Sequence, residues 1–324
     1  NAGGGGVNRN LIINGAMNVA QRGTSSTGLG ASTGYFTVDR FVMATDSSNA
    51  TAGRFTMSQD SSAPSGFANS LKLDCTTADT SIAAGEVVIL RQIIEGQNLQ
   101  SFAKGSSDAK PFAVSFYVKG NASATYACEL VDSDNTRQIS KTFNVTTDWT
   151  RVELTFPADT TGAFDDDNAG SLEFNIYLHS GSTYAGGTLN SSSWASTTNA
   201  NRAAGISSFF DSTDRTFFIT GVQLEVGQNP TEFEHEPFER TLKKCERYCY
   251  IFTTDDQNGV IQLTQDKDGD VYYATMFFPT QMRGDPTVTY TGMDRLHKYA
   301  VEYDTLSGTN VYFVHQQGFL ISTI

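Results

Sequence analysis

The segment FFITGVQLEVGQNPTEFEHEPFERTLKKCERYC, residues Phe217–Cys249, contains a strand, a turn and a helix in succession. Residues Thr216–Val226 are rich in β-branched and aromatic side chains, which favour an extended strand. The next residues, Gly227–Pro230, interrupt a strand ladder and predict a turn. We therefore expect a large β domain before this segment and a smaller domain after it.

The residues after the turn predict a short linking helix. Pro237 suits the first helical turn, where a missing N–H removes no hydrogen bond. Glu234, Glu236 and Glu239 lie where the dipole of the helix favours negative charge. One apolar stripe with helical spacing is expected to be buried, and it consists of Phe238, Leu242, Cys245 and Cys249.

Upstream of this segment, apolar and polar residues alternate with the period of a strand that has one buried face. The alternation is clearest in Phe112–Val118, Val152–Phe156 and Leu172–Leu178. Further strands are expected at Leu71–Cys75, Glu86–Ile94 and Tyr126–Val131. Many short strands joined by polar turns indicate an all-β protein with a two-sheet sandwich, for which we expect a jelly roll.

Length and charge restrict the classes of protein to consider. The chain has 324 residues, which suggests two domains, and a net charge of -13. No nucleic-acid partner is expected, because binding to phosphates needs an excess of Lys and Arg. No membrane insertion is expected either, because no apolar run approaches the roughly 20 residues that span a bilayer.

The four cysteines do not form a recognisable disulfide or metal-binding pattern. Cys75 and Cys128 lie in apolar, strand-like segments and are expected to be small buried hydrophobic residues. Cys245 and Cys249 are one helical turn apart, and a helix directs their side chains in parallel, which disfavours a disulfide.

Five motifs together resemble bacteriophage tail-fibre and other virion appendage proteins. They are NLIINGAMNVAQRG (10–23), YFTVDRF (35–41), ITGVQLEVG (219–227), CERY (245–248) and MRGDPTVT (282–289). The segment Ile94–Gly120 is similar to a further block of that family, and the fold that it implies resembles carbohydrate-binding modules. The chain departs from the family at Phe41, where Trp is usual, so the apolar contact is kept and the indole N–H is lost.

The motifs and patterns together divide the chain into four parts. Residues 1–9, which include Gly3–Gly6, are expected to be a flexible Gly-rich leader. Residues 10–235 are expected to form the jelly-roll sandwich, which resembles a carbohydrate-binding module. Residues 236–250 are the linking helix, and residues 251–324 are expected to form a small antiparallel β domain.

The resemblance implies a non-enzymatic structural protein located in the virion. We expect a tail fibre or other appendage that binds the host surface through glycans, contacts other virion proteins and forms a homotrimer. The alternative is a capsid decoration protein or a tail or collar adaptor that binds only virion proteins. A polysaccharide depolymerase is a third alternative, although the sequence lacks HExxH and Walker motifs.

Seven residues of these motifs are expected to fix the fold. They are Asp39, Arg40, Gln223, Glu225, Cys245, Arg247 and Tyr248. For the Asp39–Arg40 pair two interpretations stay open. The pair is either a clamp for a ligand, or Arg40 pairs with an acid inside the sandwich, for which Glu225 is a candidate.

Glycan-binding candidates lie in the polar loop that surrounds Trp194. A tryptophan among small polar residues is suited to stack on a sugar ring, while amides such as that of Asn199 bind its hydroxyl groups. Tyr184 is a weaker companion. In the alternative interpretation, Trp194 folds back to cover the edge of the sandwich.

A weak candidate for Ca²⁺ is the acidic turn with Asp165, Asp166 and Asp167. Carboxylate and amide oxygens are the ligands that Ca²⁺ prefers. The alternative is a solvated acidic turn, and no other cofactor is expected. Residues Asp266–Asp270 resemble the start of an EF-hand loop but lack its closing glutamate, so no site is expected there.

Overall fold

The computed structural model describes residues 8–252, 264–265, 272–289, 295–298, 301–305 and 310–323. The chain divides into two compact units, Asn1–Thr241 and Leu242–Ile324. The boundary falls inside helix α2 (Phe238–Glu246), within the region predicted to be the linking helix. Each unit is described here by itself.

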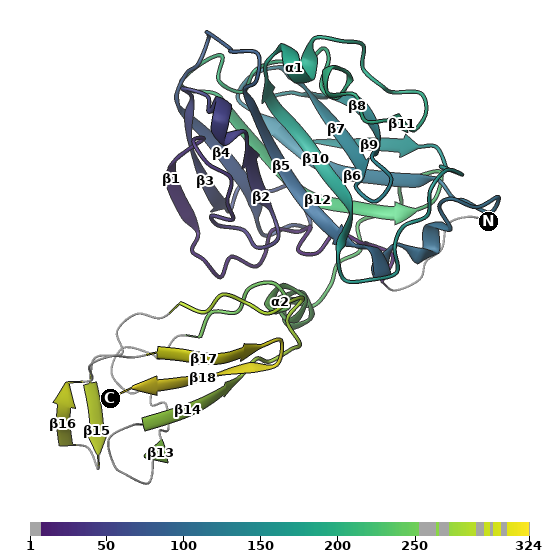
Figure 1. Cartoon of the computed structure of the whole chain (residues 1–324). Coiled ribbons are helices and arrows are strands. Elements are labelled where there is room, and N and C mark those ends of the chain that lie inside the picture. Colours follow the sequence, from purple (N-terminus) through teal and green to yellow (C-terminus); the bar gives the residue numbers. More distant parts are fainter. Residues whose placement is uncertain are drawn as a thin grey trace. The chain divides into compact units, whose positions relative to one another are not determined.

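The first unit is a sandwich of two antiparallel sheets of six strands each (Figure 1). Sheet A has the order β1 (Ser25–Leu29), β3 (Arg54–Asp60), β4 (Ser70–Thr77), β12 (Thr216–Val226), β6 (Phe112–Gly120) and β9 (Thr150–Phe156). Sheet B has the order β11 (Ala195–Ser196), β8 (Arg137–Val145), β7 (Ala124–Asp132), β10 (Gly170–Ser180), β5 (Val87–Glu95) and β2 (Val42–Thr45). This arrangement is the predicted jelly-roll sandwich.

Helices in the described residues are short. They are α1 (Ser182–Ala185), α2, and the 3-10 helices η1 (Ser47–Asn49), η2 (Gly96–Asn98), η3 (Gln100–Phe102) and η4 (Asn199–Asn201). In α2 the predicted buried stripe is only partly confirmed, because Cys245 is fully buried but Phe238 is 53% exposed. None of these helices has the length and apolar character needed to cross a membrane.

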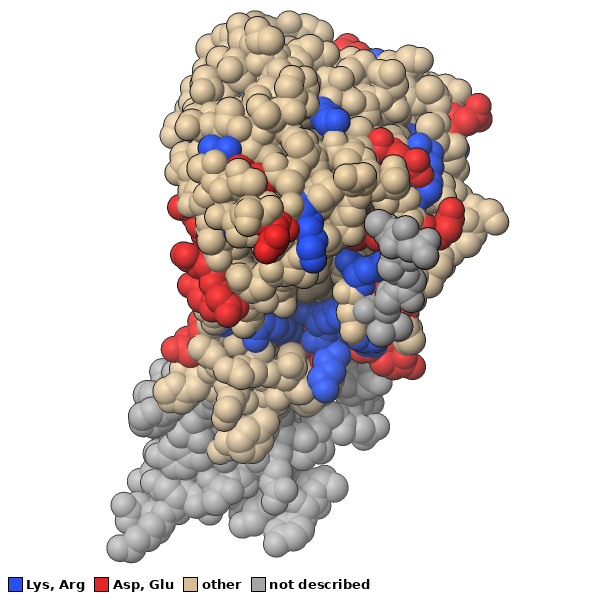
Figure 2. Space-filling model, turned by 90° about the vertical axis from the view of Figure 1, so that its right-hand side faces the viewer, with Lys and Arg blue, Asp and Glu red and all other residues tan. Residues whose placement is uncertain are grey.

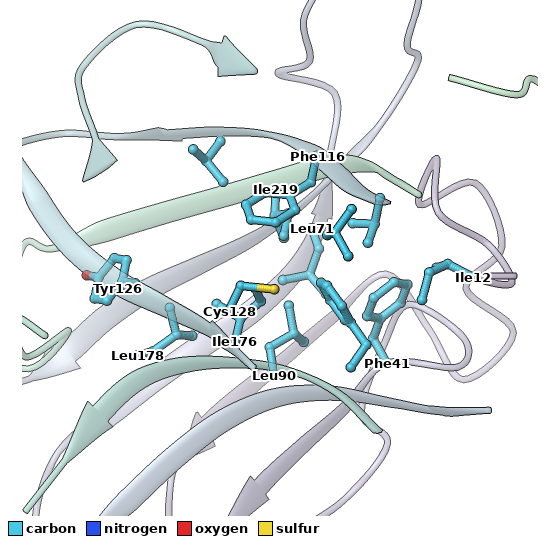
Figure 3. Packing of buried hydrophobic residues seen from close by; sticks show 14 of the residues in the cluster. Ile12, Phe41, Leu71, Leu90, Phe116, Tyr126, Cys128, Ile176, Leu178 and Ile219 are labelled. Carbon is cyan, nitrogen blue, oxygen red and sulfur yellow. The ribbon is translucent and has the colours of Figure 1, made fainter. Parts of the chain in front are cut away.

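Alternating apolar residues form the core between the two sheets. In β6 the side chains of Phe112, Val114, Phe116 and Val118 are fully buried, while Tyr117, between the last two, is partly exposed. Figure 3 shows residues of sheet A packed against residues of sheet B, namely Phe116, Ile219 and Leu71 against Leu90, Ile176 and Leu178. Burial of one such large side chain contributes roughly 1.5–3 kcal/mol to stability. Cys75 and Cys128 are buried, as predicted, and none of the four cysteines forms a disulfide.

Strand β12 contains a bulge that changes which residues face the core. Its register to β6 shifts between Thr220 and Gln223, and Gly221 has a φ of 62°. Before the bulge Phe217 and Ile219 face the core, and after it Val222 and Leu224 do. A strictly alternating strand would have directed Gln223 into the core, so the glycine in TGVQLEVG reverses the pattern.

The segment that precedes the first strand is held against β12. The apolar run Leu11–Ile13 favours a strand, but it forms an irregular turn instead. Gly15 accepts a hydrogen bond from the N–H of Val222 at 3.0 Å. A Cβ atom at Gly15 would lie only 2.1 Å from the carbonyl oxygen of Val222, so the two backbones are in close contact.

The second unit is a small antiparallel β domain, as predicted. One sheet has the order β13 (Thr264–Gln265), β14 (Tyr272–Phe277), β18 (Gly318–Thr323) and β17 (Asn310–His315), and β15 (Arg295–Lys298) pairs with β16 (Val301–Thr305). The motif residues of this unit contact one another, because the N–H of Arg283 donates to the carbonyl of Arg247 at 2.9 Å. The β-branched run Thr287–Tyr290 favours a strand, but its residues 287–289 form none, and residues 266–270 lie outside the described part.

We predict that Gly15→Ala destabilises the sandwich by about 1–3 kcal/mol, because the added methyl group forces two backbones apart. Denaturant unfolding followed by circular dichroism measures this change. Gly284→Ala is the matched control, because a Cβ atom there meets no atom within 4 Å. Equal midpoints for the two variants would contradict the close contact at Gly15.

Candidate functional site

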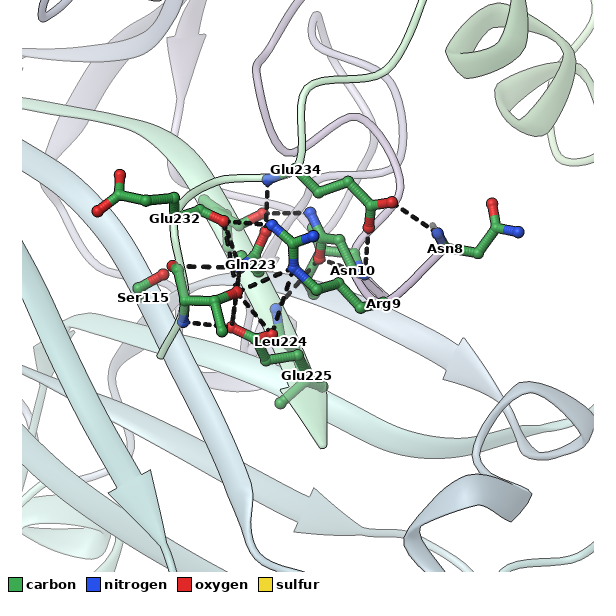
Figure 4. A network of polar contacts seen from close by, with 12 residues as sticks. Asn8, Arg9, Asn10, Ser115, Gln223, Leu224, Glu225, Glu232 and Glu234 are labelled. Atoms are coloured by element: carbon green, nitrogen blue, oxygen red, sulfur yellow. Dashed lines mark hydrogen bonds and ion pairs between the residues drawn. The ribbon is translucent and has the colours of Figure 1, made fainter. Parts of the chain in front are cut away.

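Polar contacts join the start of the sandwich to its last strand (Figure 4). The carboxylate of Glu234 accepts hydrogen bonds from the backbone N–H groups of Asn8 at 2.6 Å and Asn10 at 2.8 Å. The side chain of Gln223 accepts from the N–H of Glu234 at 2.8 Å. Burial raises the pKa of Glu234, but the N–H groups of Asn10 and Asn8 outweigh burial and hold it below its ordinary value of 4.5.

Arg9 corrects two expectations from the sequence. Its guanidinium lies 3.5 Å from the buried carboxylate of Glu225 and donates to Thr231 at 2.9 Å. The cation paired with Glu225 is thus Arg9, whereas Arg40 donates to the carbonyl of Ile93 at 2.6 Å. Arg9 was also assigned to the flexible leader, yet it is fixed in this network, while residues 1–7 lie outside the described part.

Asp39 and Arg40 are buried inside the sandwich, with 1% and 5% exposure. Asp39 accepts hydrogen bonds from the side chain of Gln21 at 2.5 Å and lies 3.6 Å from Arg22. Burial raises the pKa of Asp39 above its ordinary value, although Gln21 and Arg22 act in the opposite direction. These contacts favour the structural interpretation of the pair over a clamp for a ligand.

Trp194 lies inside the sandwich edge. Its side chain is 6% exposed, and its indole N–H donates to the carbonyl of Pro157 at 2.8 Å. The ring packs against Phe112, with 5.3 Å between the ring centroids, and the ammonium of Lys104 lies 5.8 Å from its centroid. The indole therefore offers no exposed platform for a sugar, and the alternative in which it covers the edge fits the structure.

The other two glycan-binding candidates do not join Trp194 in one exposed site. Tyr184 is half-buried in α1 and packs over the outer face of sheet B beside Val87 and Tyr177. Asn199 is exposed at the start of η4, and its carbonyl accepts from the N–H of Arg202 at 3.2 Å. The loop is thus mainly a cover for sheet B.

A buried ion cluster lies beside Trp194. The ammonium of Lys104, 1% exposed, lies 2.5 Å from Asp132 and 3.2 Å from Asp159. Arg137 pairs with Asp159 at 2.7 Å. Burial raises the pKa of Asp159, but Arg137 and other hydrogen bonds outweigh it, so the net shift is downward. This cluster was not predicted, because its members are far apart in the sequence.

The acidic turn does not gather its carboxylates around one point. Asp165, Asp166 and Asp167 are exposed, and one oxygen of Asp167 accepts from the N–H of Ala169 at 2.8 Å. Within the described residues, the only group of three potential metal ligands consists of Asp79, Glu86 and His179. A solvated acidic turn is therefore the interpretation that fits the structure.

The outer face of sheet A carries aromatic residues that the sequence analysis missed. Phe218 of β12 lies between Lys72 of β4 and Lys119 of β6, its partners on the two neighbouring strands. Both ammonium groups approach the ring, at 5.5 Å and 5.9 Å from its centroid. Trp149, directly before β9, packs edge-on against Phe218 with 6.1 Å between centroids. Both aromatic rings are partly exposed.

Two further aromatic residues continue this surface along the sheet. Tyr117 of β6 pairs with Thr220, two residues beyond Phe218, and contacts Phe67 at 5.4 Å between ring centroids. Gly221 makes room for them, because a Cβ atom there would lie 2.8 Å from the ring of Phe67. We call Trp149, Phe218, Tyr117 and Phe67 the outer aromatic surface.

Charged side chains of both signs occur on the face drawn in Figure 2. On the face drawn in Figure 2, Asp and Glu occur beside Lys and Arg, and much of the sandwich surface carries neither. The positive groups of the outer aromatic surface are partly balanced too, because Lys72 pairs with Asp74 at 2.6 Å. The net charge of -13 is thus not a uniform acidic coat.

We predict that Lys104→Met destabilises the sandwich by roughly 3–5 kcal/mol, because it leaves two buried carboxylates without their shared cation. Urea unfolding of the purified chain measures the change. Lys110→Met removes an exposed lysine and is the control, for which less than about 0.5 kcal/mol is expected. A similar small change for Lys104→Met would contradict a structural role for the ion cluster.

Acid is predicted to release the N-terminal contacts. Because the pKa of Glu234 is lower in the folded chain, its contribution to stability is present above its unfolded value of 4.5 and is lost as pH falls through its folded value. Glu234→Gln should therefore be less stable than the unmodified chain at pH 7 and approach it below pH 4.5. If the stabilities of Glu234→Gln and the unmodified chain differed by the same amount across this pH range, the lowered pKa of Glu234 would be disproved.

No protein-family model and no curated protein sequence matches the chain. The resemblance to phage appendage proteins thus depends on the motifs alone and stays a prediction.

Solved structures with a similar arrangement include three carbohydrate-binding modules. A family 61 module in complex with β-1,4-galactotriose has 10% identity and a TM-score of 0.34, with 68% of this chain and 99% of that chain covered. A family 30 module has 11% identity and a TM-score of 0.32, with 71% and 91% covered. A family 11 module of a Clostridium thermocellum cellulase has 10% identity and a TM-score of 0.30, with 65% and 98% covered. Scores this low carry no argument about function.

Proposed function

We propose that this chain is a non-catalytic virion protein, a phage tail fibre or other external appendage whose sandwich binds a glycan of the host surface. The virion assignment rests on the sequence motifs, which in the folded chain occupy positions that organise it. Asn10 and Gln223 belong to the network at the start of the sandwich, and Gly221 forms the bulge of β12. The motif residues therefore determine the fold, and they do not themselves locate the binding surface.

The outer aromatic surface is the observation that supports glycan binding. The face of an aromatic ring is electron-rich and attracts the polarised C–H groups of a sugar. Trp149 and Phe218 supply partly exposed rings, and Lys72 and Lys119 supply ammonium donors within reach of the same rings. Hydroxyl or carboxylate groups of a sugar are suitable acceptors for these donors. Apolar rings with a few polar groups beside them are typical of sites for such ligands.

Multivalency supplies the strength that a single open surface lacks. A flat sheet face buries less of a ligand than a cleft does, so each contact is expected to be weak. A homotrimer on a fibre, repeated over one particle, raises the effective concentration of surfaces near a repeating glycan. The proposed activity is therefore adsorption by several weak sites.

The second candidate is an adaptor or decoration protein that binds only other virion proteins. Burial of Trp194 favours it, because the loop predicted to hold the glycan covers the sandwich instead. In that case the outer aromatic surface is covered by another virion protein, for which partly exposed aromatic residues are equally suitable.

Glycan binding is predicted to depend on the outer aromatic surface. Trp149→Ala and Phe218→Ala should each weaken the affinity for the best ligand of a glycan array by about tenfold, equivalent to about 1.4 kcal/mol. Tyr35→Ala is the control, because Tyr35 is an exposed aromatic residue outside this surface. A loss caused by Tyr184→Ala instead would move the site to the loop over sheet B.

Antibody labelling of intact particles under the electron microscope tests the virion assignment. Label on tails or fibres is expected. Label spread over the capsid, together with an array that shows no ligand, would favour the decoration protein. Release of reducing ends from host polysaccharide would show a depolymerase and overturn the non-catalytic assignment.

A further inference from the structure

Three potential metal ligands converge at one end of the sandwich. Asp79 follows β4 of sheet A, Glu86 precedes β5 of sheet B, and His179 lies in β10. Their ligand atoms all lie within 4.8 Å of one another, and the three side chains are buried, with exposures of 5%, 6% and 0%. The three residues therefore link the segment between β4 and β5, which crosses from sheet A to sheet B, to the central strand β10.

The histidine is oriented for ligation. Its Nε2 lies 3.1 Å from a carboxylate oxygen of Glu86, and its Nδ1 lies 2.8 Å from the hydroxyl of Ser208. The pairing of β5 with β10 brings Glu86 beside His179. Ser208 is suited to hold the ring, because a partner on the second nitrogen fixes the tautomer and direction of a metal-binding imidazole.

Asp79 is also held in position. One of its oxygens accepts hydrogen bonds from the hydroxyl of Thr51 at 2.6 Å and the N–H of Ala52 at 2.8 Å. The other accepts from the N–H of Ser81 at 3.1 Å. These hydrogen bonds fix the direction of the carboxylate. Each oxygen has further lone pairs for a cation.

The charge of the group is the second, independent observation. Among the described ion pairs, neither Asp79 nor Glu86 has a Lys or Arg partner, and the only basic group beside Glu86 is His179. By contrast, the buried carboxylates of Asp132 and Glu129 pair with Lys104 and Arg202. Buried carboxylates are costly unless hydrogen bonds or a cation compensate for their charge.

We propose that Asp79, Glu86 and His179 bind a divalent transition metal, with Zn²⁺ as the ion to test. In a tetrahedral zinc site, bonds of about 2.0–2.1 Å place neighbouring ligand atoms about 3.3 Å apart, close to the 3.1 Å between His179 and Glu86. An imidazole nitrogen suits zinc, whereas Ca²⁺ prefers oxygen ligands alone. Water is suited to complete the coordination.

Such an ion has a structural role, independent of the proposed glycan binding. It would tie residues 78–86, which cross from sheet A to sheet B, to strand β10. A Ser–His–carboxylate trio resembles a hydrolase relay by residue type. However, His179 is fully buried, and Ser208 already accepts the N–H of Phe210 at 3.0 Å. The trio therefore fits ligation better than catalysis.

Isothermal titration of Zn²⁺ into the full, tag-free chain, stripped with a chelator, tests the proposal. One ion per chain is expected, with a rise in the melting temperature. Glu86→Gln and His179→Gln should each weaken binding at least tenfold. His235→Gln is the matched control, because His235 is an exposed histidine outside the group, and its affinity should not change. Circular dichroism checks that each variant is folded.

X-ray absorption at the bound zinc provides a measurement that needs no variant. Nitrogen and oxygen ligands, including one imidazole, are expected. Sulfur ligands would place the ion at Cys245 and Cys249 and overturn the proposal. Absence of Zn²⁺ binding, unchanged binding in both folded variants, or displacement of Zn²⁺ by equimolar Ca²⁺ would overturn it as well.

Discussion

The bulge at Gly221 in β12 is the constraint on which the rest of the sandwich depends. Strand β12 lies between β4 and β6, so any change in its facing direction affects both neighbours. Because the bulge reverses the alternation, Val222 and Leu224 enter the core and Gln223 turns to the outer side. There it meets the segment with Glu234, and the same glycine leaves space for the ring of Phe67. One residue thus connects the core, the network of Figure 4 and the outer aromatic surface.

Local sequence patterns were sufficient to predict those strands that have one apolar face. Strand β12 has the predicted bounds, Thr216–Val226, and β6 and β10 lie where alternation placed them. Strand β8 was missed because its sequence, RQISKTFNV, is polar at most positions. It is a strand because its neighbour β7 pairs with it along nine residues, a long-range contact that no local pattern records.

The candidate site was harder to predict, because a tryptophan has the same appearance in the sequence whether it is exposed or buried. Trp194 was predicted to bind a sugar because it lies in a polar loop. In the structure, its contacts with the carbonyl of Pro157 and the ring of Phe112 hold it inside the sandwich. Trp149 sits beside ordinary strand residues and gave no local signal. Its partner Phe218 becomes part of a surface only when β4, β12 and β6 align. Arg9 was assigned to a leader for the same reason, since its partners are more than 200 positions away.

The network at the start of the sandwich also determines how the unit responds to tension. Asn8 and Arg9 contact Glu234 and Thr231, so the chain enters and leaves the sandwich at neighbouring points. A force that pulls these two points apart acts first on this small group of hydrogen bonds and the Arg9–Glu225 ion pair. Glu225 and Gln223, which hold this group together, belong to β12, so the same strand carries the load and Phe218 of the outer aromatic surface. Tension on the two ends of the sandwich is therefore passed directly to the strand that supports its aromatic face.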